Sequence, residues 1–204
     1  MGKIYLACRN EAKVQAAKHE LEQESGKRPF EIILMDVSVR TSVRAAFKLL
    51  PRPIDALVMN AGRPGGTSPM ARTKDGVTGI LATYVLGHVI LLDHLIASSL
   101  LTRAAAYVGS EAARGVLKLG MKRPELPNSS VQDFVDIFTG KNFSRKKFDG
   151  ALAYGEVKYI AALWMAAAAR RHCHLHLLTV SPGNTYGTNL IDGLPAPAAV
   201  RARS

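Results

Sequence analysis

The sequence has little cysteine, few aromatic side chains and no concentrated block of charge. Cys8 and Cys173 are the only cysteines in 204 residues, which excludes a disulfide scaffold and favours a reducing, cytoplasmic compartment. Aromatic residues make up 6% of the chain, and the 27 basic residues are scattered, although they outnumber the 16 acidic ones. A basic stripe interleaved with aromatics is missing, which argues against nucleic-acid binding, while the net charge of +11 favours small anionic ligands.

The sequence also lacks a segment typical of a signal peptide or of a membrane span. Its first ten residues are too few and too charged for a signal peptide. Residues 79–101 are long enough to cross a bilayer, but they include His88, Asp93 and His94. Because an unpaired charge inside a bilayer is costly, we predict that this run is a long buried helix and that the protein has no membrane span.

Short apolar runs alternate with longer helical patterns along most of the chain. We predict strands at residues 3–7, 31–37, 55–62, 104–110 and 174–180, and helices at 11–24, 39–50, 75–101, 131–138 and 151–171. Strands alternating with helices of this length indicate βαβ units and a parallel sheet covered on both faces. The predicted fold class is therefore α/β, a doubly wound parallel sheet in one domain of residues 1–190, with a flexible tail at 191–204.

Polar or glycine residues follow every predicted strand. They are Arg9, Asp36, Asn60, Ser110 and the pair Pro182-Gly183. Ligands of open parallel sheets bind beyond the carboxyl ends of the strands. Because all of these residues belong at such ends, the sequence predicts one shared binding site there.

Tyr154 and Lys158 stand four places apart in the last predicted helix, so they share a helical face. A tyrosine has an unperturbed pKa of about 10, too high for proton transfer at neutral pH, and we expect the nearby ammonium to lower it. The Ser110 hydroxyl could hold a carbonyl oxygen within reach of the phenol. These residues suit proton transfer to a carbonyl or alcohol oxygen while a cofactor carries the hydride. Tyr-x-x-x-Lys alone is common by chance, so the wider pattern has to carry the interpretation.

The order of the motifs resembles the short-chain dehydrogenase/reductase family over nearly the whole chain, from residue 3 to about residue 190. Along the chain the motifs read ACRN, MDV, NAG, YVGS, YGEVK and SPGNTYGT. The resemblance implies a Rossmann-like fold and three catalytic residues. Tyr154 would be the proton donor and acceptor, Lys158 would lower its pKa and bind the nicotinamide ribose, and Ser110 would position the substrate oxygen.

The resemblance also implies a nicotinamide dinucleotide cofactor. The implied cofactor-binding residues are Arg9, Asn10, Asp36, Val37, Asn60, Ala61, Gly62, Lys158, Pro182, Gly183, Thr185 and Thr188. Arg9 stands where NAD-dependent members tend to carry an acidic residue, and a guanidinium suits the 2′-phosphate of NADP. NADP is therefore expected rather than NAD.

Two departures from the family pattern bear on activity. Tyr84 stands where the family usually has a relay asparagine, in a segment that reads Asn-x-x-Gly-His. The family's first strand and its Gly-x-x-x-Gly-x-Gly turn, where a helix N-terminus takes the pyrophosphate, have no counterpart in this sequence. We therefore expect a chain truncated at both ends, with a sheet that lacks the strand between residues 3–7 and 55–59.

Two further patterns leave alternatives open. His172, His174 and His176 alternate and could share one face around a zinc ion, but no carboxylate or cysteine partner is evident, so no metal is expected. Residues 121–142 are longer than the family usually has between Ser110 and Tyr154. They form either a lid or substrate wall, or a surface excursion without consequence.

The sequence therefore predicts a cytoplasmic, NADP-dependent oxidoreductase that interconverts a carbonyl and an alcohol on a small apolar substrate. That small molecule is its expected partner, nucleic acid is not, and a homo-oligomer is left open. One alternative is a catalytically impaired or inactive relative that acts as a binding protein. The other is a truncated product with no independent function.

Overall fold

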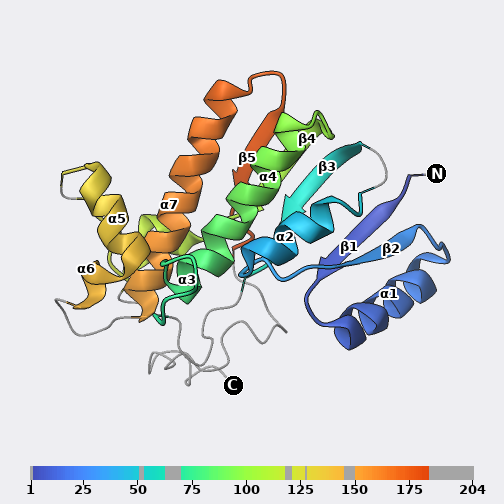
Figure 1. Ribbon diagram of the computed structural model, residues 1–204, viewed down its shortest axis with the longest axis horizontal. Coiled ribbons are helices and arrows are strands. Elements are labelled where there is room, and N and C mark those ends of the chain that lie inside the picture. The colour runs from blue at the N-terminus through green and yellow to red at the C-terminus, as the bar shows by residue number, and fades with distance from the viewer. Residues whose placement is uncertain are drawn as a thin grey trace.

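The computed structural model describes residues 2–50, 53–62, 70–117, 121–126, 128–144 and 150–183. Its strands are β1 (Ile4–Cys8), β2 (Phe30–Leu34), β3 (Ile54–Met59), β4 (Leu101–Val108) and β5 (His176–Val180). Its helices are α1 (Glu11–Ser25), α2 (Arg40–Phe47), α3 (Gly79–Leu81), α4 (Gly87–Ala97), α5 (Val131–Thr139), α6 (Lys141–Ser144) and α7 (Gly150–Arg171). The predicted alternation of strands and helices is confirmed (Figure 1). The predicted tail at 191–204 lies outside the described residues.

All strand pairs in the described residues are parallel, as predicted, but the strands do not form one continuous sheet. β1 pairs with β2, and β3 pairs with β4, which pairs with β5. Between β1 and β3 the ladder is interrupted, at the position where the sequence predicts a missing strand. The two sheets lie side by side with their strands running in the same direction (Figure 1).

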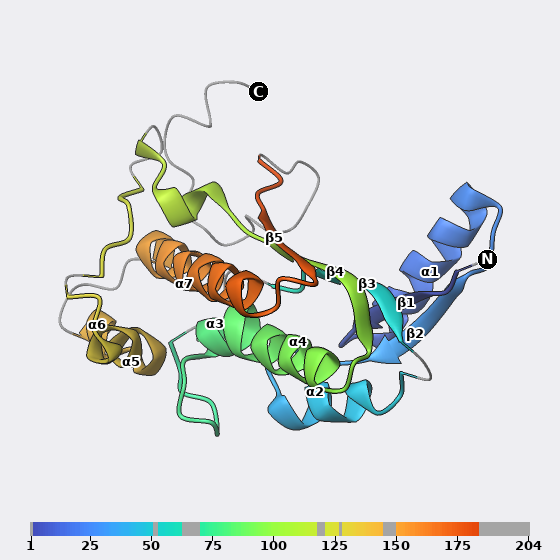
Figure 2. The same cartoon turned by 90° about the horizontal axis from the view of Figure 1, so that it is seen from above.

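The helices cover the two sheets unequally. Helices α2, α4 and α7 lie on one face, and α1 lies on the other face beside β1 and β2 (Figure 2). Among the described residues, α1 covers β1 and β2 but does not reach the three-stranded sheet (Figure 2). On its open face Val58 is 67% exposed, Leu178 54% and Val180 49%. An apolar sheet face of this kind normally packs against another layer.

The long apolar helix differs from its prediction at residues 75–101. It begins at Gly79, where the Thr78 hydroxyl accepts from the Leu81 N–H at 3.4 Å, and it ends at Ala97. A π-helical turn, Ala82–Leu86, interrupts it between α3 and α4. The segment Gly79–Ala97 is long and apolar enough to cross a membrane, but Leu92 and Leu95 on it are fully buried against the rest of the protein. That burial is what a core helix requires.

The boundaries of the strands depart from the prediction by a few residues. β2 ends at Leu34 rather than at residue 37, and β4 begins at Leu101 rather than at 104. Met35 still donates its N–H to the Cys8 carbonyl at 3.0 Å, but the turn held by Asp36 and Ser38 follows at once. The apolar sequence of residues 31–37 alone does not show where β2 ends.

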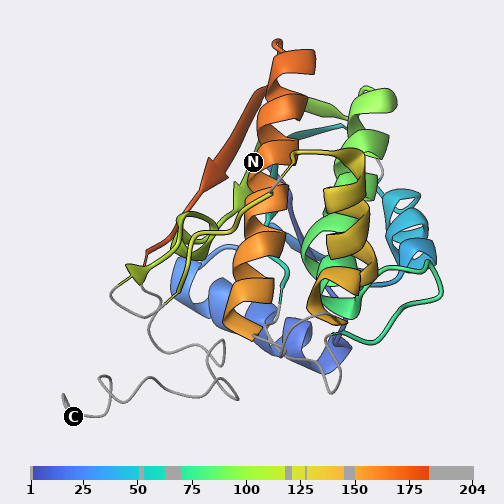
Figure 3. The same cartoon turned by 90° about the vertical axis from the view of Figure 1, so that its left-hand side faces the viewer.

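The inserted segment between Ser110 and Tyr154 packs onto the body of the protein. A capping box between Ser130 and Asp133 begins α5, and Ile137 on this helix is 3% exposed. The Thr78 N–H donates to the Phe138 carbonyl at 2.9 Å, which joins the end of α5 to the start of α3. The segment is therefore packed against the body of the protein and is not an isolated surface loop (Figure 3).

Candidate active site

Three side chains at the carboxyl end of β4 form the centre of the site. Ser110 follows β4, and Tyr154 and Lys158 lie one turn apart on α7. The Ser110 hydroxyl interacts with the phenol of Tyr154 and lowers the pKa of that phenol. A glycine makes this approach possible, because a Cβ on Gly155 would lie 2.9 Å from the carbonyl oxygen of Ala112, just beyond Ser110. The three predicted catalytic residues therefore lie together, because the small Gly155 lets α7 pack closely against the chain that follows β4.

Lys158 is almost completely buried, with 5% of its surface exposed. Its Nζ donates to the carbonyl oxygen of Val108 at 2.6 Å and lies 4.8 Å from the ring centroids of both Tyr84 and Tyr107. Burial lowers the pKa of this ammonium to about 8. The two ring faces and the carbonyl compensate part of the charge that burial leaves without water.

The expectation that Lys158 lowers the pKa of Tyr154 is wrong. Burial raises the pKa of this phenol above its ordinary value, and the interaction with Ser110 opposes the rise only in part. Nζ of Lys158 lies 5.9 Å from the ring centroid of Tyr154 and hydrogen-bonds elsewhere. The phenol is therefore held protonated at neutral pH, so it is ready to donate a proton.

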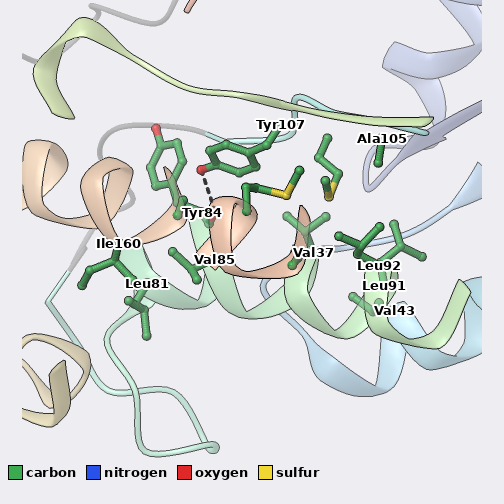
Figure 4. Packing of buried hydrophobic residues seen from close by; sticks show 14 of the residues in the cluster. Val37, Val43, Leu81, Tyr84, Val85, Leu91, Leu92, Ala105, Tyr107 and Ile160 are labelled. Carbon is green, nitrogen blue, oxygen red and sulfur yellow. Dashed lines mark hydrogen bonds between the residues drawn. The ribbon is translucent and has the colours of Figure 1, made fainter. Parts of the chain in front are cut away.

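Tyr84 fills the space beneath Tyr154 and Lys158. It lies in the π-helical turn, a feature that often marks functional sites, and it is 2% exposed. Its ring packs edge-to-face on Tyr154 with centroids 5.4 Å apart. Its carbonyl accepts from the Tyr107 hydroxyl at 2.8 Å (Figure 4). The Tyr84 hydroxyl has no partner among the described residues, and burial raises its pKa.

A cavity of about 1060 Å³ lies between β1 and β3. At the carboxyl ends of the strands its lining includes six of the residues predicted to bind a cofactor, namely Arg9, Asp36, Val37, Asn60, Ala61 and Gly62. Apolar side chains of α2 and α4, among them Phe47, Leu91 and Leu95, line its floor. An apolar cavity with a few polar groups at one end is typical of a small-molecule site.

The other predicted cofactor residues are placed less uniformly. Asn10 caps α1, since its side-chain oxygen accepts from the Lys13 N–H at 2.9 Å. Pro182 and Gly183 follow β5, which pairs with β4, the strand that precedes Ser110. Thr185 and Thr188 lie outside the described residues.

The three alternating histidines are not gathered into a metal site. The rings of His172 and His174 pack edge-to-face with centroids 6.1 Å apart, and His176 lies at the start of β5. Among the described residues no group of three histidine, cysteine or acidic side chains has the geometry to hold a metal ion.

Comparisons with known proteins agree with the motif order and with the fold. No protein-family model matches the chain. It is 26% identical over 211 residues to dehydrogenase/reductase SDR family member 12 of Bos taurus, and 30% identical over 156 residues to family member 13 of the same species. These alignments cover 100% and 74% of this chain. The chain is related to the short-chain dehydrogenase/reductase family. It spans 60% and 40% of the lengths of these two relatives.

Solved structures show the same fold as this short-chain dehydrogenase relative. A crystal structure of an uncharacterized protein from Mycobacterium Paratuberculosis superposes with a TM-score of 0.69 at 24% identity, over 93% of this chain and 62% of that one. An alcohol dehydrogenase from the archaeon Thermococcus sibiricus, complexed with 5-hydroxy-NADP, superposes with a TM-score of 0.64 at 16% identity, over 96% and 71% of the two chains.

Two residues of this short-chain dehydrogenase relative support the end of the cavity that Val37 and Ala61 line, and they were not among the predicted site residues. Nε2 of buried His88 donates to the Ala61 carbonyl at 2.7 Å, which holds the Asn60-Ala61-Gly62 turn. Gly87 lies directly against the Val37 carbonyl, and a Cβ there would overlap that oxygen. The Gly-His pair of the family segment was the signal that could have identified both.

Proposed function

We propose that the protein is an NADP-dependent oxidoreductase that interconverts a carbonyl and an alcohol on a small apolar substrate in the cytoplasm. One observation carries the proposal: the half-buried Tyr154 phenol interacts with the Ser110 hydroxyl, which lowers the pKa of that phenol, and the buried Lys158 ammonium lies one helical turn away. This set of groups suits proton transfer at an oxygen atom.

In the direction of reduction, the substrate carbonyl oxygen takes the position between the Ser110 hydroxyl and the Tyr154 phenol. Tyr154 then donates its proton to the developing alkoxide, which its raised pKa allows, because the phenol is fully protonated before the reaction. Lys158, which is cationic below about pH 8, stabilises the phenolate that remains. A nicotinamide cofactor supplies the hydride when it is bound.

The residues at the carboxyl end of the cavity fit such a cofactor chemically. Arg9 is an exposed guanidinium at the end of β1, suited to a 2′-phosphate. Asp36 accepts from the backbone N–H and the hydroxyl of Ser38 at 2.9 and 2.6 Å, so its carboxylate is engaged within its own turn. These features, and the similarity to an NADP-type complex, favour NADP over NAD.

The inserted segment supplies an apolar wall for the substrate. Pro124 lies beside Gly155, next to Tyr154, and Leu126 packs against the core. Leu117, on the chain that leads into this segment, is 85% exposed. An apolar substrate that contacts this wall would place its carbonyl toward Ser110.

A second candidate function is that of a relative without catalytic turnover that binds a nucleotide. The observation that favours it is the position of Lys158, whose Nζ is engaged by the Val108 carbonyl and covered by Tyr84. An ammonium fixed in this way is withheld from the ribose that the family's lysine contacts. The two candidates differ in turnover and agree in binding.

The test is reduction of a panel of aliphatic and aromatic aldehydes and ketones with NADPH, followed by absorbance, with cofactor binding measured separately. Tyr154→Phe removes only the ionisable oxygen, and the matched control is Tyr159→Phe on the same helix. We expect Tyr154→Phe to lose about 10²–10⁴-fold in kcat with NADPH affinity retained, and Tyr159→Phe to stay near wild type. Binding without turnover in the wild-type protein would favour the second candidate, and more than about a tenth of kcat in Tyr154→Phe would refute the role of Tyr154.

A further inference from the structure

Lys158 carries a buried positive charge that no carboxylate neutralises in the part of the chain that the structure describes. Its side chain is 5% exposed, and none of the ion pairs of the described residues includes it. Its Nζ donates to the Val108 carbonyl at 2.6 Å. Because an ammonium has three N–H donors, this carbonyl alone does not replace the water that is lost on burial. Other groups must compensate the rest of that loss.

Two tyrosine rings supply this compensation. Nζ of Lys158 lies over the ring of Tyr84 and over that of Tyr107, 4.8 Å from each centroid. A cation within about 6 Å of a ring centroid is attracted by the negative face of the ring. Burial raises the pKa of both phenols, so both tyrosines are neutral and neither offers Lys158 an anion. The attraction therefore comes from the ring faces and not from the hydroxyl groups.

The ring of Tyr84 has a fixed position. A Cβ on Gly62 would overlap this ring, so the ring occupies the space that a side chain at Gly62 would need. On another side the ring packs edge-to-face on Tyr154, with centroids 5.4 Å apart. The π-helical turn Ala82–Leu86 directs the side chain to this place, because its wider turn rotates the residues relative to a regular α-helix. The ring is therefore held between Gly62, Tyr154 and Lys158.

Tyr107 fixes both the second ring and the turn that carries the first. Its hydroxyl donates to the carbonyl of Tyr84 at 2.8 Å (Figure 4). Its own ring is 1% exposed and packs edge-to-face on Trp164 and on His88, with centroids 6.4 and 5.7 Å away. A hydrogen bond thus joins the two residues whose rings cover Lys158, so the two rings are positioned together.

We propose that Tyr84 and Tyr107 form an aromatic cage that holds the Lys158 ammonium against the Val108 carbonyl, and that Tyr84 is thereby a positioning residue of the site. The cage keeps Nζ 5.9 Å from the ring centroid of Tyr154, where it acts on the phenol as a fixed positive charge. The effect of the cage on turnover rests on the proposed function, whereas its effect on Lys158 does not.

The other titratable groups near Lys158 keep their charge over the range in which Lys158 titrates. Burial and the positive charge of Lys158 lower the pKa of His88, which is therefore neutral above pH 7. Burial raises the pKa of Tyr154, as it does for the two cage tyrosines. Glu156 stands two positions from Lys158 on α7, so the two do not share a helical face, and it accepts from Asn142 at 3.1 Å. The titration of Lys158 therefore reports on its own surroundings.

The experiment replaces the Tyr84 ring in the full chain and follows Lys158 by NMR. Lysines carry ¹³C at Cε, and Lys158→Met identifies the resonance of Lys158. Tyr84→Leu removes the ring face and keeps an apolar side chain, and Tyr84→Phe is the matched control, because it keeps the ring and loses only the hydroxyl.

We expect the pKa of Lys158 to stay within about 0.3 of wild type in Tyr84→Phe. In Tyr84→Leu it should fall by about half a unit or more, because the buried ammonium loses an attractive ring face. A pKa in Tyr84→Leu that equals or exceeds the pKa in Tyr84→Phe overturns the cage.

A measurement on the wild-type protein decides the question if Tyr84→Leu does not fold. Ring currents shift nuclei above an aromatic face upfield, so the Cε protons of Lys158 should resonate upfield of those of an exposed lysine such as Lys13. Cε protons of Lys158 at the position of the exposed lysines would overturn the cage.

The pH profile of carbonyl reduction distinguishes failure of the cage from failure of the proposed function. If Lys158 must be cationic for turnover, the alkaline limb of the kcat profile should move to lower pH in Tyr84→Leu, by the same amount as the pKa from NMR. It should not move in Tyr84→Phe. A lowered pKa from NMR with an unmoved limb, or with no turnover at all, would support the cage and refute the catalytic role of Lys158. A moved limb with an unchanged lysine pKa would overturn the cage.

Discussion

The two sheets of this protein are stabilised very differently. The three-stranded sheet is packed against α4 and α7, where Leu92, Leu95 and Met165 are at most 1% exposed, and it carries the catalytic candidates Ser110, Tyr154 and Lys158. In the other part, α1 buries only Val14 among its described residues. That part nevertheless carries Arg9, a main determinant of the expected cofactor preference.

This difference in burial distinguishes the proposed proton-transfer residues from Arg9, the residue proposed to select the cofactor. Hydrophobic burial, which provides most of the stability of a domain, is concentrated around the proposed proton-transfer residues. Of the residues proposed to recognise the nucleotide, Arg9, Asn10, Asp36 and Val37 lie in the two-stranded part, whereas the others within the described residues lie in the three-stranded part. We therefore expect substitutions in the two parts to act on different measured quantities.

The largest expected effect on stability is in the three-stranded part. Leu92→Ala removes a fully buried side chain and should lower the free energy of unfolding by about 2–5 kcal/mol. Leu21→Ala makes the same chemical change on α1, where Leu21 is 36% exposed, and should cost less than about 1 kcal/mol. Urea unfolding followed by the fluorescence of Trp164 on α7 measures both. Equal costs would show that the two parts are equally packed.

A smaller effect is expected from the pH dependence of Lys158. Its pKa is lowered to about 8 in the folded protein, whereas the unfolded chain holds that proton up to about 10.4. Between these values the unfolded state binds more protons, so stability should rise with pH, by up to about 2–3 kcal/mol between pH 8 and pH 10. Lys158→Met should remove the rise, as urea unfolding at several pH values would measure. A stability that falls over this range in the wild-type protein would contradict the burial of a charged Lys158.

The next expected effect is on cofactor choice. Arg9→Ala should weaken NADPH binding by about tenfold or more, because a guanidinium–phosphate contact contributes about 1.5–3 kcal/mol. NADH binding should be unchanged. Arg28→Ala, at an exposed position before β2, is the matched control and should leave both affinities near wild type. Titration of each variant with NADPH and with NADH measures these affinities. If Arg9→Ala still prefers NADPH, another residue determines the preference.

The smallest expected effect is that of the cofactor on the chain itself. Because the ladder is interrupted between β1 and β3, we expect a weakly cooperative thermal melt and little stabilisation by millimolar NADPH. The reason is that β1 and β3 leave edge groups without hydrogen bonds and that the pyrophosphate has no glycine-rich turn. Melting curves with and without NADPH are the measurement. A cooperative melt that rises by several degrees with NADPH would show that the two parts already act as one.

Much of the fold followed from local patterns. The alternation of apolar runs with helical periodicity located each strand and the main helices of the described residues. The motif order placed Ser110, Tyr154 and Lys158 at one site. The positions of strand ends and the start of the long helix were less accurate, because they depend on caps such as Thr78 and on turns such as that of Asp36. The π-helical turn around Tyr84 has no signal in apolar periodicity.

The sequence by itself determined the order of the elements, the parallel pairing and the shared face of Tyr154 and Lys158, because all of these depend on spacing along the chain. Only the tertiary structure decided the protonation of the site. Burial raises the pKa of Tyr154, and the Val108 carbonyl and two aromatic rings draw Lys158 away from it. The structure also decided that Val58, Leu178 and Val180 are exposed on one face of the three-stranded sheet in the described residues, and that the ladder is interrupted between β1 and β3. Burial and edge pairing depend on residues distant in sequence, so no local pattern determines them.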